Sequence, residues 1–163
     1  MAKLVKAGVT LRDQVDAKFI NRDKRSDGWI GNSEHAARAS FHNPDKNGWV
    51  HALDIDENFG VGKWRNGGAA KRFANELIAY SRSTLPGHDR VLHVVYEDQV
   101  ASGTYKARAS FWKFRGRGYS HFQHIHISFT EAAVKNGALF PLPCLALSAQ
   151  AKKDWTARLA PWL

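Results

Sequence analysis

Residues 123–129, QHIHISF, alternate strictly between polar and apolar side chains from His124 onward. Side chains two residues apart in a strand project from the same face, so this pattern predicts a β-strand with His124 and His126 on one face. His121 lies just before the strand, which gives the spaced set His121-x-x-His124-x-His126. Because imidazole is both the commonest metal ligand and the usual proton carrier near neutral pH, two on one face can converge on one ion.

Other segments of the chain have the patterns of strands and helices. Strands are predicted at WVHALDID, residues 49–56, and at the β-branched RVLHVVY, residues 90–96. Helical spacing of apolar residues predicts helices over 11–20, 69–80 and about 148–159. The pair Thr10 and Asp13 resembles a helix start for the first of them. Strands interleaved with helices at irregular spacing indicate an α+β fold, a small, mostly antiparallel sheet flanked by helices.

A long segment rich in Ser, Asn, Gly and Asp, residues 26–48, is predicted to be an ordered loop of the kind that is usually functional. It contains His42, and Asp54 follows on the next predicted strand. An aspartate inside an apolar run such as HALDI is unusual unless it is paired or binds a metal. Two His and one carboxylate, with the fourth position left to water, form the ligand set of a catalytic Zn²⁺ site. The alternative is a hydrogen-bonded Asp54 and a surface His42.

Length, charge and cysteine content limit the possible architectures and partners. The 163 residues fit one domain of about 150 residues, so residues 1–163 are expected to form a single domain. A single cysteine excludes an intrachain disulfide, and a metal site must use His and carboxylates. The net charge of +9 favours an anionic partner: nucleic acid, membrane or cell wall. No apolar run approaches the ~20 residues of a membrane span, and the start lacks a signal peptide, so we expect a soluble protein without its own export signal.

Taken together, the motifs resemble a family of peptidases. The run RASFHNP at 38–44, ALD at 52–54 and HIHIS at 124–128 are similar to the LAS metallopeptidases, which include lysostaphin-type enzymes, D-alanyl-D-alanine carboxypeptidases and murein endopeptidases. The same runs are also similar to small carboxypeptidase-like members from actinobacterial phages and their lysins. The resemblance covers about residues 25–130 and leaves 131–163 as a C-terminal extension with a helix.

The resemblance implies a role for each residue of the motif. It implies that His42, Asp54 and His126 hold Zn²⁺, while His124 and His121 assist in proton transfer and oxyanion stabilisation. Two departures from the family pattern stand out. The stretch NPDKN, residues 43–47, looks like an insertion between the first two ligands. Gln123 stands where carboxypeptidase-type members have Glu or Asp, so the general base is either His124 or a carboxylate from elsewhere; the candidates are Asp56, Glu97 and Asp98.

The expected function is hydrolysis of a peptide bond in bacterial peptidoglycan, as in the catalytic domain of a phage endolysin. A nearby His can take a proton from the attacking water and return it to the leaving amine. Arg38 either binds a substrate carboxylate or tethers the loop, with neither favoured.

The expected partners are peptidoglycan and anionic wall polymers, and neither a membrane span nor nucleic acid is expected. The enzyme is expected to be a monomer that is made in the host cytoplasm and acts on the cell wall.

Two functions of other classes compete with this expectation. A metal-dependent nuclease would suit the charge and the aromatic-basic stretch FWKFRGRGY at 111–119, although His-Asn-His nucleases carry their catalytic set within one hairpin and helix. The second competing function is a non-catalytic wall-binding module with a degenerate zinc site. The complete set of three predicted ligands argues against a degenerate site. His35, His88 and His93 are interpreted as structural, and His51 as a packing or surface residue.

Overall fold

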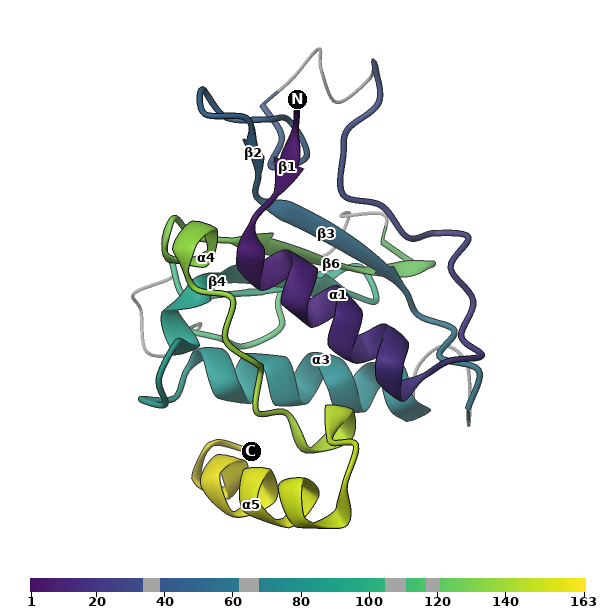
Figure 1. Ribbon diagram of the computed structural model, residues 1–163, viewed down its shortest axis with the longest axis vertical. Coiled ribbons are helices and arrows are strands. Elements are labelled where there is room, and N and C mark those ends of the chain that lie inside the picture. The colour runs from purple at the N-terminus through teal and green to yellow at the C-terminus, as the bar shows by residue number, and fades with distance from the viewer. Residues whose placement is uncertain (34–38, 62–67, 105–110, 117–120) are drawn as a thin grey trace.

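The chain forms one antiparallel sheet with helices on one side (Figure 1), in a computed structural model that describes residues 1–33, 39–61, 68–104, 111–116 and 121–163. The strands are β1 (Lys3–Leu4), β2 (Trp49–Val50), β3 (Ala52–Asp56), β4 (Val91–Tyr96), β5 (Gln99–Ser102) and β6 (His124–Phe129). The helices are α1 (Lys6–Lys18), α3 (Gly68–Ser81), α4 (Ala132–Lys135) and α5 (Ala149–Leu159), with 3-10 turns η1 (His88–Arg90), η2 (Pro143–Leu145) and η3 (Ala160–Trp162). The predicted α+β class is confirmed.

The main sheet has the strand order β3-β6-β4-β5, and every neighbouring pair in it is antiparallel. A separate parallel pair joins β1 to β2. The predicted strand over residues 49–56 is therefore divided at His51: its first part pairs with β1 and its second with β6. This division turns the chain from the small sheet into the main one.

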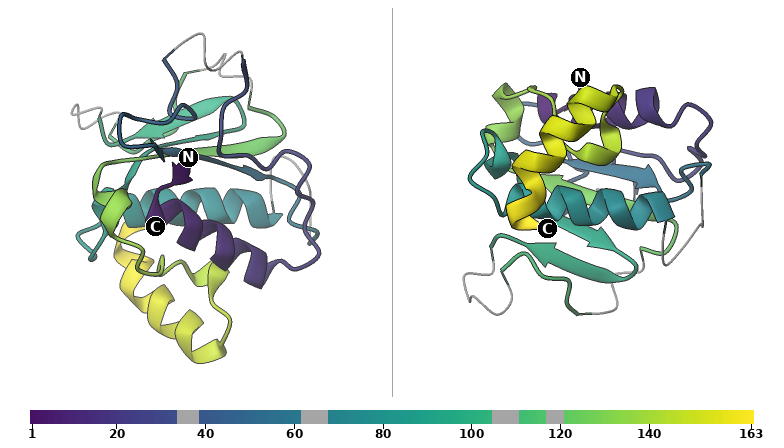
Figure 2. Two further views of the ribbon diagram at one scale, coloured as in Figure 1. Left: turned by 45° about the horizontal axis from the view of Figure 1, so that its top comes forward. Right: turned by 90° about the horizontal axis from the view of Figure 1, so that it is seen from below.

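The hydrophobic core lies between the sheet and the helices α1 and α3, and α5 lies on the far side of those helices (Figure 2). Buried core residues of the sheet and of the two helices are Leu53, Ile55, Ile125, Ile127, Leu11, Phe73 and Leu77. One continuous cluster runs from Leu4 to Leu159, so the C-terminal helix shares the core of the single domain. Because strand residues alternate between faces, Asp54 and His126 lie on the face away from these helices.

The first helix begins earlier than the sequence pattern predicts. It runs over Lys6–Lys18 rather than 11–20, and no side chain caps its start at Val5. Thr10 lies inside the helix, and its hydroxyl donates to the carbonyl oxygen of Gly137 at 2.8 Å. The early start has a packing cause, because the fully buried Val5 and Ala7 extend the apolar face to which Leu11 belongs.

The sequence patterns do not predict three short elements, β1, β5 and α4, each of which is two to four residues long. The β4–β5 hairpin closes with Glu97 and Asp98, which have φ values of 49° and 63°. Two successive residues at positive φ are typical of the tight turns that match the twist of a hairpin. No helix in the described part of the chain is long and apolar enough to cross a membrane.

Candidate metal centre

Two of the predicted ligands, Asp54 and His126, lie opposite each other on the neighbouring strands β3 and β6. This register places both side chains on the face that the helices leave open. At the outer edge of β3, the backbone N–H of Asp54 donates to the carbonyl oxygen of Gly28 at 2.6 Å, and Gly28 N–H donates back at 3.1 Å. Both hydrogen-bonding groups of the Asp54 backbone are therefore paired with Gly28, while β3 pairs with β6 along its other edge.

The third predicted ligand, His42, reaches this position from the loop before β2. Gly31 N–H donates to the carbonyl oxygen of His42 at 2.9 Å, and His51 N–H donates to that of Phe41 at 3.1 Å. The hydroxyl of Ser40 accepts from the backbone N–H of His42 at 3.2 Å. These contacts hold the imidazole of His42 in a buried position against β3 and β6.

The donor atoms of His42, Asp54 and His126 form a compact triangle. His42 Nε2 lies 3.2 Å from His126 Nδ1 and 3.2 Å from Asp54 Oδ2, and His126 Nδ1 lies 2.9 Å from Asp54 Oδ1. Among the residues the structure describes, this is one of two groups of His and carboxylate side chains that could hold a metal ion. The sequence motif thus brings together three residues that are 84 positions apart at their extremes.

Hydrogen bonds behind the triangle orient both imidazole rings. His42 Nδ1 lies 3.2 Å from the carbonyl oxygen of Trp29, which can only accept, so Nδ1 carries a proton and Nε2 is the atom that can give up its proton to bind a metal. His126 Nε2 lies 2.9 Å from the hydroxyl of Ser128. When Nε2–H donates to this hydroxyl, Nδ1 is the atom that faces the triangle, and it can bind a metal once it no longer donates to Asp54 Oδ1. Such outer contacts select the tautomer that a metal requires.

The electrostatics of the site favour an ionised Asp54. Burial opposes its ionisation, but hydrogen bonds to His126 and His42 outweigh burial and hold the pKa of Asp54 far below its usual value. Burial also opposes protonation of His42, yet its contact with Asp54 raises the pKa of His42 above the ordinary value. Asp54 therefore keeps its negative charge, and a metal ion that binds beside it competes with the proton on His42.

The two predicted proton carriers lie beside the triangle. His124 Nε2 is 3.7 Å from Asp54 Oδ1, and burial lowers the pKa of His124, which favours its neutral form. The ring centroid of His121 lies 4.9 Å from that of His124 and 5.3 Å from that of His126. Both residues therefore border the centre at the end of β6 where the strand begins.

A fifth imidazole at the centre is that of His93, which the sequence pattern had suggested to be structural. Its ring stacks on His126 with centroids 5.6 Å apart, and Phe41 contacts its other side at 5.5 Å. Burial, together with the charges of His126 and His121, lowers the pKa of His93 to about 4. In the sequence, His93 stands out as a polar residue within an apolar strand. The face of the sheet on which it lies follows only from its pairing with Ser128.

The remaining candidates lie elsewhere or outside the described residues. Asp56 is buried and accepts from the backbone N–H groups of Ser26 and Asn58 at 3.1 and 2.8 Å, which makes it a structural carboxylate. Glu97 and Asp98 form the β4–β5 turn, and Gln123 accepts through its backbone from Glu57. Arg38 and His35 fall in the range 34–38, outside the described residues.

The aromatic-basic stretch is described only over residues 111–116, and there it does not form a row of exposed rings. Trp112 is buried in the core and Phe114 packs against it, so Phe111 alone of the three is well exposed. Stacking of successive bases requires several accessible rings. This part of the chain gives little support to a nucleic-acid platform.

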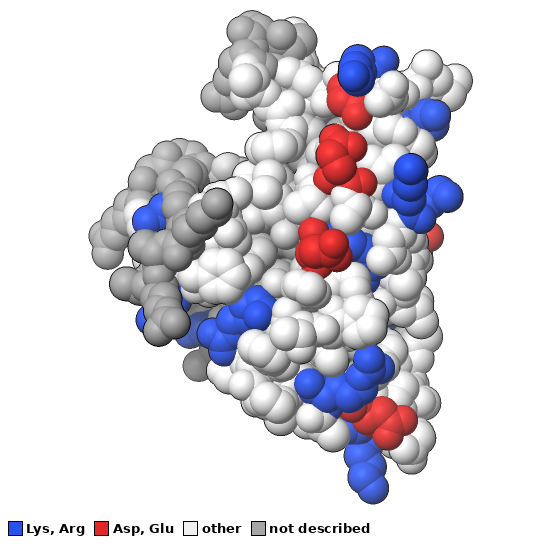
Figure 3. Space-filling view, turned by 90° about the vertical axis from the view of Figure 1, so that its left-hand side faces the viewer, with Lys and Arg blue, Asp and Glu red and all other residues white. Residues whose placement is uncertain are grey.

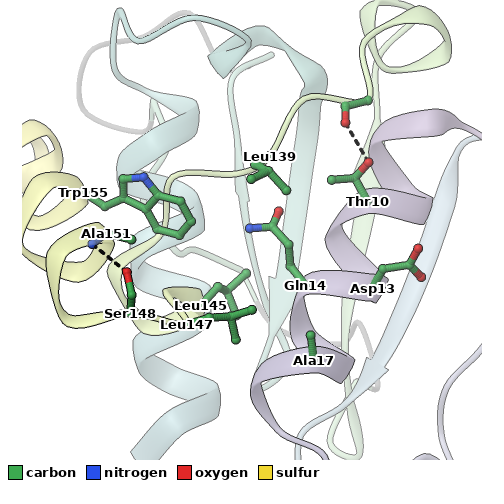
Figure 4. Close-up of a pocket in the computed structure, with 11 residues that line it drawn as sticks. Thr10, Asp13, Gln14, Ala17, Leu139, Leu145, Leu147, Ser148, Ala151 and Trp155 are labelled. Atoms are coloured by element: carbon green, nitrogen blue, oxygen red, sulfur yellow. Dashed lines mark hydrogen bonds between the residues drawn. The ribbon is translucent and has the colours of Figure 1, made fainter.

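A hollow of about 570 Å³ lies among α1, the segment 137–148 and α5, as Figure 4 shows. Apolar side chains line most of it, including Leu139, Leu147 and Trp155, while Gln14 is tied to the backbone of Phe140. It lies on the helical side of the molecule and contains none of the histidines of the centre.

Comparison of the chain with protein-family models, curated proteins and solved structures finds no match.

Proposed function

We propose that this protein is a zinc-dependent peptidase that hydrolyses a peptide bond in the stem or cross-link peptides of bacterial peptidoglycan, as a phage endolysin does. The donor triangle of His42, Asp54 and His126 is the observation that carries the proposal. The resemblance of the sequence motifs to the LAS metallopeptidases supports the choice of substrate.

The donor set fits zinc in both chemistry and spacing. Ligand atoms about 2.0–2.2 Å from a tetrahedral zinc ion lie about 3.3–3.6 Å from each other. The three separations here, 3.2, 3.2 and 2.9 Å, are within a few tenths of an ångström of that range. Two neutral imidazoles and one carboxylate are also a common protein ligand set for catalytic zinc. Zinc, when bound, lowers the pKa of its water to about 7 and polarises a carbonyl group.

The surrounding side chains have separate tasks in this proposal. The Trp29 carbonyl and the Ser128 hydroxyl hold the two imidazoles in the ligand tautomer. His124, neutral at the edge of the centre, takes a proton from the attacking water as the C–O bond forms. It then returns the proton to the amine nitrogen as the C–N bond breaks. His121 lies against His124 and steadies the negative charge that develops on the carbonyl oxygen.

Digestion of purified peptidoglycan, followed by mass spectrometry of the soluble fragments, tests the proposal. The wild type is expected to release fragments with one new amino and one new carboxyl terminus, which identify the bond that is cut. Asp54→Asn should lose both bound zinc and activity. Stoichiometric zinc with no new termini would instead indicate a non-catalytic zinc module, and a wild type without zinc would contradict the proposal.

A second variant separates metal binding from proton transfer. His124→Ala should retain bound zinc and the wild-type melting temperature, because three other side chains complete the donor set. Its turnover is expected to fall by about 10²–10⁴, the usual contribution of a positioned proton carrier. Wild-type turnover in this variant would remove His124 from the mechanism, and loss of zinc would make it a ligand.

A further inference from the structure

A second group of metal-binding side chains lies outside the centre described above. Asp45 comes from the loop before β2, His51 from the junction of β2 and β3, and Glu131 from the residue before α4. His51 Nε2 lies 3.4 Å from Asp45 Oδ2 and 3.7 Å from Glu131 Oε1. Three separate segments of the chain therefore direct one donor atom each to a common point.

Two of the three side chains are held in place before any ligand binds. Asp45 Oδ1 accepts from the backbone N–H groups of Asn47 and Trp49 at 2.7 and 2.9 Å, which leaves Oδ2 directed at His51. The His51 side chain is only 10% exposed, and its backbone is tied to Phe41 and Phe129. Glu131 is exposed at the rim and can adjust its position.

The spacing of the donors distinguishes a metal ion from an ammonium group. Oxygen or nitrogen atoms that surround an ammonium nitrogen at about 2.8 Å lie about 4.6 Å apart in tetrahedral geometry. Ligands of a tetrahedral ion of the zinc class lie about 3.3–3.6 Å apart. The separations of 3.4 and 3.7 Å from His51 are close to the second range. One imidazole with two carboxylates suits zinc, cobalt or manganese.

We propose that Asp45, His51 and Glu131 form a second binding site for a divalent metal ion of the zinc class. The three side chains line a hollow of about 730 Å³ that Ser40, Phe41 and Asn43 also border. Because Phe41 and Asn43 flank His42, an ion bound there ties the loop that carries the first ligand to the junction of β6 and α4. Figure 3 views the side of the molecule on which α4 lies, where acidic side chains run down the upper half with Lys and Arg side chains beside them.

Zinc stoichiometry of the full-length protein tests this proposal without reference to activity. Metal-free protein is dialysed against zinc, and bound metal is measured by mass spectrometry together with a calorimetric titration. Two zinc ions per chain are expected for the wild type and one for His51→Gln. Glu131→Gln, whose side chain is exposed, should fold normally and bind the second ion more weakly. The matched control is His88→Gln, because His88 contacts the Leu85 carbonyl and belongs to neither group.

The outcomes distinguish this site from the centre of the proposed peptidase. Loss of one ion in His51→Gln and of a different one in Asp54→Asn supports both sites. An ion that is lost in His51→Gln but kept in Asp54→Asn, with no other ion bound, supports the second site and contradicts the first. A single zinc in the wild type that both His51→Gln and Glu131→Gln retain overturns the second site, as does a second zinc that neither substitution affects.

Discussion

Ser128 contacts the candidate metal centre through the ring of His126. It is fully buried, and its hydroxyl lies 2.9 Å from His126 Nε2. Ser128→Ala should weaken zinc binding by about 10–100-fold, because the ring of His126 loses the partner that selects its tautomer. A zinc-chelator competition assay measures the change.

The matched control for Ser128→Ala is Ser102→Ala. Ser102 is also a buried serine on a strand of the main sheet, but its hydroxyl donates to the carbonyl oxygen of Leu92 rather than to a member of the triangle. Ser128→Ala removes the hydroxyl contact with His126, and Ser102→Ala removes contacts with Leu92 and Thr104, each hydrogen bond being worth about 1 kcal/mol to folding. Equal zinc affinity in the two variants would show that Ser128 has only a structural role.

The sequence predicts individual site residues where they belong to a local pattern. Alternation in QHIHISF put His124 and His126 on one strand face, and the structure brings His126 together with the predicted His42 and Asp54. Their roles as ligands stay predictions. His93 and the second group could not be found in this way, because their positions depend on strand register and on contacts between distant segments. Asp45 and Glu131, for example, meet through His51.

At the level of elements, a buried arginine joins the end of α1 to the loop that borders β3. Arg22 Nε donates to Asp16 Oδ1 at 2.8 Å, and both Nη atoms contact Asp27. Asp27 Oδ1 also accepts from the backbone N–H of Asp56 at the end of β3. The side chain of Arg22 is 0% exposed, so its charge depends on these carboxylates. This network holds the segment that leads to Gly28 and Trp29.

Arg22→Met should lower the free energy of unfolding by about 3 kcal/mol. Removal of one partner from a buried ion pair costs about 3–5 kcal/mol, and the lower end applies because Asp16 and Asp27 keep some contact with solvent. Urea unfolding followed by circular dichroism measures the change. Arg25→Met is the control, since Arg25 is exposed and its ion pair with Asp23 contributes little. Equal midpoints for the two variants would contradict a structural role for the network.

Elements with long periodic patterns were predicted well, and short ones were not. Helix α3 and strands β4 and β6 begin and end within one residue of the predicted bounds. Strand β5 consists of the four residues QVAS, and its pairing depends on the Glu97-Asp98 turn rather than on its own composition. The start of α1 was wrong because buried residues before Thr10 extend the helix, which a capping pattern alone does not reveal.

For the molecule as a whole, the layered arrangement explains why one face of the sheet is available for chemistry. Helices α1 and α3 cover the other face and bury the isoleucines of β6 there. The face that carries Asp54 and His126 is bordered instead by the loops before β2 and after α1. A site formed in this way uses the rigidity of paired strands for two ligands and a loop for the third, so the spacing of the donors depends most on how the loop is anchored.

The net charge of +9 leads to a prediction about how the whole molecule binds its proposed substrate. If long-range attraction brings the protein to anionic wall polymers, binding to intact cell walls should weaken as salt shortens the Debye length from about 10 Å at 0.1 M to about 3 Å at 1 M. Hydrolysis of a short, uncharged cross-link peptide by the same protein should change little, because no extended polymer is involved. Sedimentation of cell walls with bound protein measures the first effect, and chromatography of the peptide products measures the second. A bound fraction that stays constant across this range of salt would mean that contacts with the stem peptide alone hold the protein on the wall.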